Sequence, residues 1–426
     1  MKPEIKQRIE QIKAGQVPDG YKRTRAGIMP YDWCCDREYR AKDIFKSITN
    51  KKHNGEFDVL SATQDKGVIP REQVDINIKY NKDSVAGYKK VDKGDFVISL
   101  RSFQGGIEYS EYEGLVSPAY TVLKPIIPIC DKYYKYYFKT SDYINRLNIG
   151  TYGIRDGKQI GYEDFGDMVI HYPPLAEQEK IAKVLSTQDR IIELYQRKIE
   201  ELQKMKKVYL SKMFPKKGEN ASEWRFSQFN DSWEQREAVD IADYSKGNGY
   251  SKSDLTENGT PIILYGRLYT KYQFAIDEVD TFATPKDGSI YSQGNEVIIP
   301  ASGETAEDIA RASAVEKSGI LLGGDLNILR PFNFINPLFL ALTISNGEPQ
   351  KELAKKAQGK SVVHIHNSDI QEVTVSFPTR AEQDRIVAVF RSLDNLITLH
   401  QRKLEETKKY KKALMQLLLT GIVRCE

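Results

Sequence analysis

Two stretches of the chain place apolar residues at alternating spacings of four and three, the heptad pattern of helices that pack along one face. Between these positions the sequence is rich in Lys, Glu and Gln, so most of each helix circumference is polar. We therefore expect two thin helices whose seams face each other. The first seam consists of Ile181, Leu185, Gln188, Ile192, Tyr195, Ile199, Leu202, Lys206, Tyr209 and Met213, and the second of Ile386, Phe390, Leu393, Ile397, His400, Leu404, Thr407, Lys411, Leu414 and Leu418.

The two helices are copies of one sequence, offset by 205 positions. Each copy follows a proline, which prevents the helix from extending further toward the N-terminus. Acidic residues then occupy its first turn, where they interact favourably with the helix dipole. A helix from Glu177 to Met213 would extend roughly 55 Å and act as a spacer. Packing of each helix on its own globular region is the alternative. The matching positions are Pro173 with Pro378, Ala176-Glu177-Gln178 with Ala381-Glu382-Gln383, Asp189 with Asp394, and Gln196-Arg197-Lys198 with Gln401-Arg402-Lys403.

A globular region precedes each helix, and these regions also look like copies. Short apolar runs bounded by Gly, Pro, Asn or Asp predict strand-rich α+β domains. Between the shared anchors the halves diverge, as expected when loops on a common frame select a ligand. The anchors are Trp33 with Trp233, Lys93–Ser99 with Gln293–Ile299, Ala119–Pro125 with Asp325–Pro331, and Glu163–Tyr172 with Ser368–Phe377.

The predicted organisation is α+β, with two tandem strand-rich domains separated by two long antiparallel coiled-coil helices in a pseudo-twofold repeat. The expected segments are an N-terminal helical segment at 1–16, a first domain at 17–172, a central helix at 173–215, a second domain at 216–376 and a C-terminal helix at 377–426.

Composition fits an intracellular protein with several cores. The chain has 426 residues, 40% hydrophobic and 29% charged, and no apolar run of the length that spans a membrane. Its four cysteines lack metal-binding spacing, so we expect neither disulfides nor structural zinc in a cytoplasmic protein. The net charge of +4 is small, and any nucleic-acid surface must therefore be local.

Catalytic motifs are not evident. The chain has no GxxxxGK[ST] phosphate loop, and His171–Leu175 shares only two prolines with the adenine-methyltransferase motif. Gly247–Tyr250 is a short glycine pair without the helix that a cofactor loop requires. If His364 and His366 lie on a strand, they share one face of it and could form a metal pair, but no third ligand is near in sequence, so packing or DNA contact of His364 is the better interpretation. We expect no catalytic residue, cofactor or metal in this chain.

The repeated helix starts identify a family resemblance. The sequences Tyr172–Ala182 and Phe377–Val387 resemble the "IPxPPLxEQxxIA" motif of type I restriction-modification specificity subunits, the second more loosely at Thr379 and Arg380. The resemblance covers nearly the whole chain. It implies a non-catalytic subunit with two target recognition domains that bind the halves of a split double-stranded DNA site. It also implies two modification subunits that use S-adenosylmethionine to methylate adenine, and motor-nuclease subunits that use ATP.

The same resemblance points to two DNA-contacting loops in each domain. A solvated surface role is the alternative for any one residue, and a coiled-coil scaffold with protein- or carbohydrate-binding heads is the alternative for the chain. The second domain has no arginine equivalent to Arg101. The loops are 100–106 and 150–158 in the first domain and 301–305 and 358–364 in the second, with the candidates Arg101, Ser102, Gln104, Tyr152, Arg155, Lys158, Ser302, Glu304, Lys360, Ser361 and His364. Additional candidates outside these loops are Arg267, Tyr269, Lys271 and Arg311.

Overall fold

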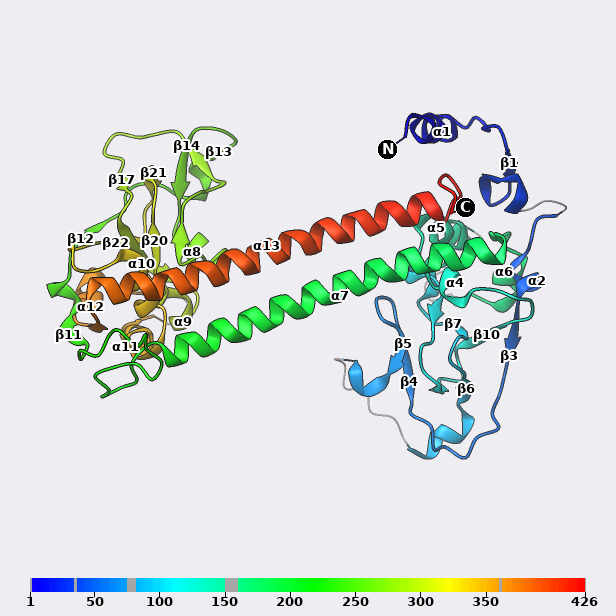
Figure 1. The fold of residues 1–426 in the computed structure, drawn as a ribbon, viewed down its shortest axis with the longest axis horizontal. Helices are drawn as coiled ribbons and strands as arrows, with labels where there is room; N and C mark the ends of the chain where they lie inside the picture. Colours follow the sequence, from blue (N-terminus) through cyan, green and yellow to red (C-terminus); the bar gives the residue numbers. More distant parts are fainter. Residues whose placement is uncertain (1, 34–36, 75–81, 150–159, 360–361, 426) are drawn as a thin grey trace. The chain divides into compact units, whose positions relative to one another are not determined.

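The computed structural model describes residues 2–33, 37–74, 82–149, 160–359 and 362–425. The chain divides into two compact units: unit 1 contains Met1–Gln196 and Arg402–Glu426, and unit 2 contains Arg197–Gln401. Both long helices expected from the heptads are present, as α7 (Leu175–Lys212) and α13 (Arg380–Leu418), drawn in green and in orange to red in Figure 1. Each long helix contributes one part to each unit.

Unit 1 is built on a four-stranded antiparallel sheet in the order β3-β10-β7-β8. Side chains of a strand alternate between the two faces, and on β7 Phe96 and Ile98 enter one apolar cluster while Val97 enters another. Both faces of this sheet are therefore covered. The strands of unit 1 are β1 (Tyr21–Thr24), β2 (Gly27–Pro30), β3 (Phe45–Ile48), β4 (Leu60–Thr63), β5 (Gly67–Pro70), β6 (Lys89–Val91), β7 (Phe96–Ile98), β8 (Glu108–Tyr109), β9 (Gly114–Val116) and β10 (Thr121–Pro125).

Aromatic residues fill the larger core of unit 1. Tyr134 of α4 and Phe138, which follows this helix, pack against Phe45 of β3, with ring centroids 5.2 and 5.7 Å away. Rings supply a large buried apolar area for each ordered side chain. The helices here are α1 (Pro3–Lys13), α2 (Ala41–Ile44), α3 (Ser102–Gly105), α4 (Asp131–Tyr137), α5 (Ser141–Ile149) and α6 (Tyr162–Asp167).

Unit 2 repeats this sheet. Its strands β12-β22-β18-β20 follow the same antiparallel order, and β15 adds a parallel edge strand. A glycine precedes the equivalent strands β7 and β18. Its φ is 97° at Gly94 and 96° at Gly294, in the left-handed region that glycine adopts without strain. The sequence anchors thus mark equivalent strands, β7 with β18 and β10 with β22.

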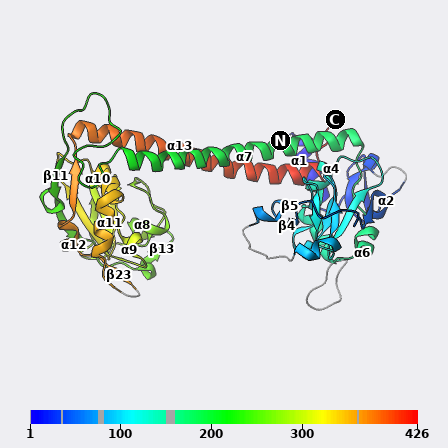
Figure 2. The same cartoon turned by 90° about the horizontal axis from the view of Figure 1, so that it is seen from below.

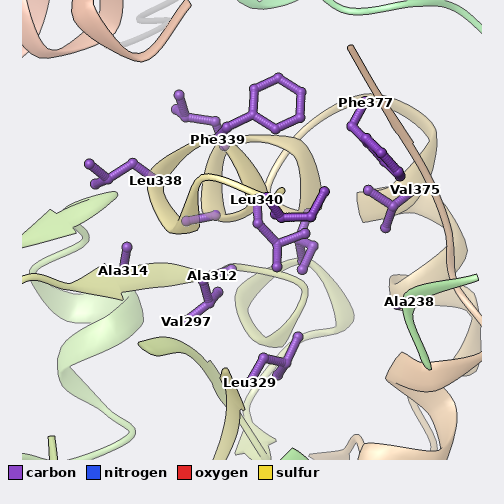
Figure 3. Packing of buried hydrophobic residues seen from close by; sticks show 14 of the residues in the cluster. Ala238, Val297, Ala312, Ala314, Leu329, Leu338, Phe339, Leu340, Val375 and Phe377 are labelled. Carbon is purple, nitrogen blue, oxygen red and sulfur yellow. The ribbon is translucent and has the colours of Figure 1, made fainter. Parts of the chain in front are cut away.

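Helix α10 covers one face of the unit 2 sheet. Figure 2 shows α10 lying against the strands of this unit. Its residues Leu338, Phe339 and Leu340 lie in the same core as Val297 of β18 and Leu329 of β22 (Figure 3). The helices of this unit are α8 (Arg267–Thr270), α9 (Ala306–Ile309), α10 (Pro337–Ile344), α11 (Gly347–Lys356) and α12 (Asn367–Gln371). Its strands are β11 (Glu234–Glu237), β12 (Ala242–Lys246), β13 (Leu255–Thr256), β14 (Thr260–Ile263), β15 (Ala275–Ile276), β16 (Phe282–Ala283), β17 (Tyr291–Gln293), β18 (Glu296–Pro300), β19 (Ser302–Gly303), β20 (Ser313–Val315), β21 (Ser318–Leu322), β22 (Leu326–Pro331), β23 (Val363–His364) and β24 (Thr374–Phe377).

The long helices pack both on each other and on the globular cores. Ile181 of α7 and Leu418 of α13 share the aromatic core of unit 1. In unit 2, Leu202 of α7 packs against Leu393 and Ile397 of α13. The two arrangements considered from the sequence are thus combined, with the heptad residues buried or half-buried throughout.

The repeated glutamine of the helix-start motif has the same structural role in both units. Gln178 donates to the Pro173 carbonyl and accepts from the Cys130 backbone N–H at 3.0 Å. Gln383 donates to the Pro378 carbonyl and accepts from the Asn336 backbone N–H at 2.7 Å. Each glutamine satisfies buried backbone groups where the helix joins its core.

Among the described residues, no helix combines the length and apolar character needed to cross a bilayer.

Candidate nucleic-acid interface

In unit 1 the candidate segment Leu100–Gly106 follows the C-terminal end of β7. Arg101 and Gln104 are exposed. Ser102 is buried, and its hydroxyl accepts a hydrogen bond from the Ser99 backbone N–H at 2.7 Å. Ser102 therefore shapes the segment from inside, while Arg101 and Gln104 are available to a ligand.

Arg101 belongs to a group of basic side chains that the sequence does not show as a cluster. Burial raises the pKa of the Tyr120 phenol, while the nearby positive charges of Arg71 and Arg101 act in the opposite direction. Lys89 donates to the Tyr120 carbonyl at 2.7 Å, and burial and the neighbouring Lys51 lower the pKa of Lys89. Sequence reasoning missed Lys51, Arg71 and Lys89 because they lie on different segments. Arg71, Lys89 and Arg101 thus each lie near Tyr120, and Lys51 lies near Lys89.

In unit 2 the equivalent segment contains a short two-stranded sheet. Ser302 of β19 pairs with His364 of β23, and the Ser302 hydroxyl lies 3.1 Å from His364 Nδ1. Ser302 is buried, whereas His364 and Glu304 are exposed. The structure thus brings together three candidates from two distant parts of the sequence.

Arg267 and Lys271 share one carboxylate. The Arg267 guanidinium and the Lys271 ammonium each lie 2.6 Å from an oxygen of Asp280, and they hold the pKa of that carboxyl well below its usual range. The Arg267 side chain is only 10% exposed, whereas that of Lys271 is 56% exposed. Arg267 therefore stabilises the α8 region, and Lys271 is the more accessible of the two.

Tyr269 and Arg311 lie near acidic residues. Burial raises the pKa of Tyr269, with further contributions from Tyr265, Glu304 and Asp308. The Arg311 guanidinium lies 3.5 Å from Asp308 and 5.7 Å from the centroid of the Tyr272 ring. Basic and acidic side chains are thus both present near this strand end.

Five candidates lie outside the described residues. They are Tyr152, Arg155, Lys158, Lys360 and Ser361.

The residues that the structure describes contain no group of three or more His, Cys, Asp or Glu side chains arranged to hold a metal ion. The expectation that His364 and His366 lie on one strand is wrong. Strand β23 ends at His364, and His366 precedes α12, where its backbone N–H donates to Asp369 at 2.8 Å.

The two sheets have the same strand order, and a different exposed polar segment follows the equivalent strand in each. This arrangement defines a duplicated recognition protein. The family model described as the type I restriction modification DNA specificity domain matches residues 37–204 and again 230–409, and the chain belongs to this family.

Relatives match along almost their whole length. The type I restriction enzyme MjaVIII specificity subunit of Methanocaldococcus jannaschii is 24% identical over 95% of this chain and 96% of its own. The crystal structure of a type I restriction-modification S subunit from M. genitalium has a TM-score of 0.53 and 15% identity, over 91% of this chain and 96% of that one. A chain from a type I R-M system described for its complex assembly has a TM-score of 0.51 and 15% identity, over 96% of this chain and 100% of its own. These two structures support the fold.

Proposed function

We propose that this chain is the DNA sequence-specificity subunit of a type I restriction-modification complex, in which each recognition domain binds one half of a bipartite target. The observation that carries the proposal is the duplicated sheet with divergent exposed residues at one strand end. Arg101 and Gln104 occupy that place in unit 1, and Glu304 and His364 occupy it in unit 2. Similar frames with different contact residues suit two different half-sites. The candidates outside the described residues stay predictions.

The long helices would set the distance between the two domains. Within unit 2, Lys206 of α7 pairs with Asp394 of α13. Within unit 1, Lys411 of α13 pairs with Asp189 of α7. Asp394 and Lys411 are the repeats of Asp189 and Lys206. Each helix therefore contributes its aspartate to one ion pair and its lysine to the other. This exchange supports an antiparallel coiled coil with pseudo-twofold symmetry, as in isologous contacts.

The helices also carry repeated apolar residues outside the seam. Leu194 and its repeat Leu399 are 52% and 45% exposed, and Met205 and its repeat Tyr410 are 41% and 58% exposed. Exposed apolar residues that recur as a set suit protein contacts. Their occurrence in two copies supports two identical modification subunits. Methyl transfer and DNA cleavage would be carried out by these subunits and by motor-nuclease subunits, with this chain as a non-catalytic component in the cytoplasm.

The second candidate function is a coiled-coil scaffold whose heads bind protein or carbohydrate. The exposed arginine Arg101, with Arg71 also near Tyr120, favours DNA, because phosphate contacts dominate the affinity of DNA-binding proteins.

The experiment is to express the chain with its modification subunits in a host that lacks other adenine methylation, and to map the methylated adenines. We expect one bipartite motif with an unspecified spacer, absent when this chain is omitted. Gel shifts of the purified complex should weaken steeply with salt. A methylation pattern that does not depend on this chain would exclude the proposal.

A further inference from the structure

The turn after β4 contacts the Leu100–Gly106 segment of unit 1. Nε2 of Gln64 donates a hydrogen bond to Oε1 of Gln104 at 3.4 Å, and both side chains are exposed. A Cβ atom added to Gly105 would lie only 2.6 Å from Cγ of Gln64, so the turn and the segment are in close contact here. Two glutamines 40 positions apart in sequence therefore form one exposed element.

Lys139 forms hydrogen bonds with both backbone segments that carry these glutamines. Its ammonium donates to the Gly105 carbonyl at 2.7 Å and to the Gln64 carbonyl at 3.2 Å. It also lies 2.6 and 2.7 Å from the two carboxylate oxygens of Glu108, whose side chain is 1% exposed. An ammonium has three N–H donors, and here they serve three elements: the β4–β5 turn, α3 and β8. The side chain of Lys139 thus holds the turn against the segment.

The glutamine pair leaves a defined set of hydrogen-bonding groups for a ligand. The bond between them uses one N–H of Gln64 and the carbonyl oxygen of Gln104. The side-chain oxygen Oε1 of Gln64 and the side-chain amino group of Gln104 have no partner among the described residues. The side-chain oxygen of Gln64 as acceptor, beside an N–H of Gln104 as donor, complements the major-groove edge of adenine, which offers its N6 amino group as donor and N7 as acceptor.

We propose that Gln64 and Gln104 together contact one adenine in the half-site bound by unit 1, and that Lys139 is the positioning residue that keeps them side by side. The proposal rests on the proposed DNA-recognition function and extends it to Gln64 and Lys139, which no sequence pattern singles out. Figure 1 shows the β4–β5 hairpin that carries Gln64.

The test measures binding of the complete complex to DNA duplexes in which each base pair of the unit 1 half-site is replaced in turn. In the unmodified complex one A·T pair should be strongly preferred. Gln64→Ala and Gln104→Ala should each lower discrimination at that same pair by about 10- to 100-fold. The double variant should lose little more than either single one, because the two side chains act as one unit.

Two further variants test the positioning role. Lys139→Met should lower discrimination at the same base pair, and it should cause no further loss when added to the double variant. Gly105→Ala should do the same by displacing Gln64. Gly87→Ala is the matched control, because an added Cβ there would meet nothing within 4 Å. Gln73→Ala, at another exposed glutamine of unit 1, is the second control.

Losses at two different base pairs, additive losses, or a uniform loss over the half-site would overturn the inference. Unchanged binding to the unit 2 half-site serves as the folding control in every variant. If the unmodified complex has no bipartite motif, the proposed function fails. If it has one, and both glutamine variants keep full discrimination, only the present inference fails.

Discussion

The Lys206 ammonium lies 2.6 and 2.8 Å from the two carboxylate oxygens of Asp394, on the seam between α7 and α13 in unit 2. Lys206 also lies 5.6 Å from the centroid of the Phe274 ring. In unit 1, Lys411 pairs with Asp189 and lies 5.1 Å from the Tyr136 ring centroid. A charged seam residue with a specific partner favours one alignment of two helices over shifted ones. These pairs therefore define the helix register.

Removing the pair in unit 2 should show coupling between its partners. The side chains of Lys206 and Asp394 are 22% and 31% exposed, so this salt bridge is intermediate between a surface and a buried one. We expect a coupling energy of about 1–2 kcal/mol between the two residues. A double-mutant cycle with Lys206→Met and Asp394→Asn, followed by urea unfolding, measures it. The control is Arg402 with Glu406, exposed by 78% and 60%, where about 0.3–0.5 kcal/mol is expected. Equal coupling in both cycles would show that the seam pair has no special role.

Shortening the helices should change the DNA spacer only when both are shortened. Deletion of residues 198–204 removes one heptad from α7 and leaves its partner unchanged, so the reciprocal ion pairs cannot both form, and methylation should be lost. Deletion of residues 396–402 as well should restore pairing and reduce the spacing by about 10 Å, or about three base pairs. Methylation mapping of both variants tests this. A spacer that stays the same in the doubly shortened chain would rule out the spacer role.

Loss of the Arg101 side chain should affect one half-site. Arg101 is exposed, and its guanidinium can contact a base edge or phosphate. We expect Arg101→Ala to weaken recognition of the unit 1 half-site by about 10- to 100-fold while assembly stays intact. Mapped methylation and gel filtration report the two effects. Arg25→Ala, at another exposed arginine of unit 1, is the control, and an identical effect of both substitutions would contradict a specific role for Arg101.

The stability of unit 1 should depend on the protonation of Glu108. Burial raises the pKa of Glu108 to about 7 from its ordinary 4.5, although Lys139 is adjacent. Because the folded chain holds this proton more tightly than the unfolded chain, the contribution to stability is present below pH 4.5 and is lost as the pH rises through about 7. Burial also raises the pKa of Asp95, to about 6, in the same direction.

Glu108→Gln should remove part of the loss of stability that accompanies rising pH. Between about pH 5 and pH 8, the free energy of unfolding of the variant should fall by about 1–3 kcal/mol less than that of the unmodified chain. Urea unfolding across this pH range measures the difference. Glu163→Gln, at an exposed glutamate, should leave the pH dependence unchanged. A variant of Glu108 with the same pH slope as the unmodified chain would contradict the assignment.

Burial determined which polar candidates stay available to DNA. Ser102 and Arg267 are residue types that suit DNA contact, but Ser102 is buried and bonds to the Ser99 backbone, and the Arg267 side chain is only 10% exposed. Sequence alone could not separate them from Arg101 and Lys271, because burial depends on neighbours brought in by strand pairing. The helix-start glutamines show the reverse case. Their repetition was visible, but their bonds to Cys130 and Asn336 became apparent only in the folded chain.

The sequence by itself determined the duplication, the two long helices and the α+β character of the globular parts. These features depend on periodicity and on residues close in sequence, which are local properties of the chain. The tertiary structure alone decided that Arg71 and Arg101 both lie near Tyr120 and that Gln64 meets Gln104. Such contacts join segments that are distant in sequence, and their geometry follows from strand order and core packing, which no local pattern specifies.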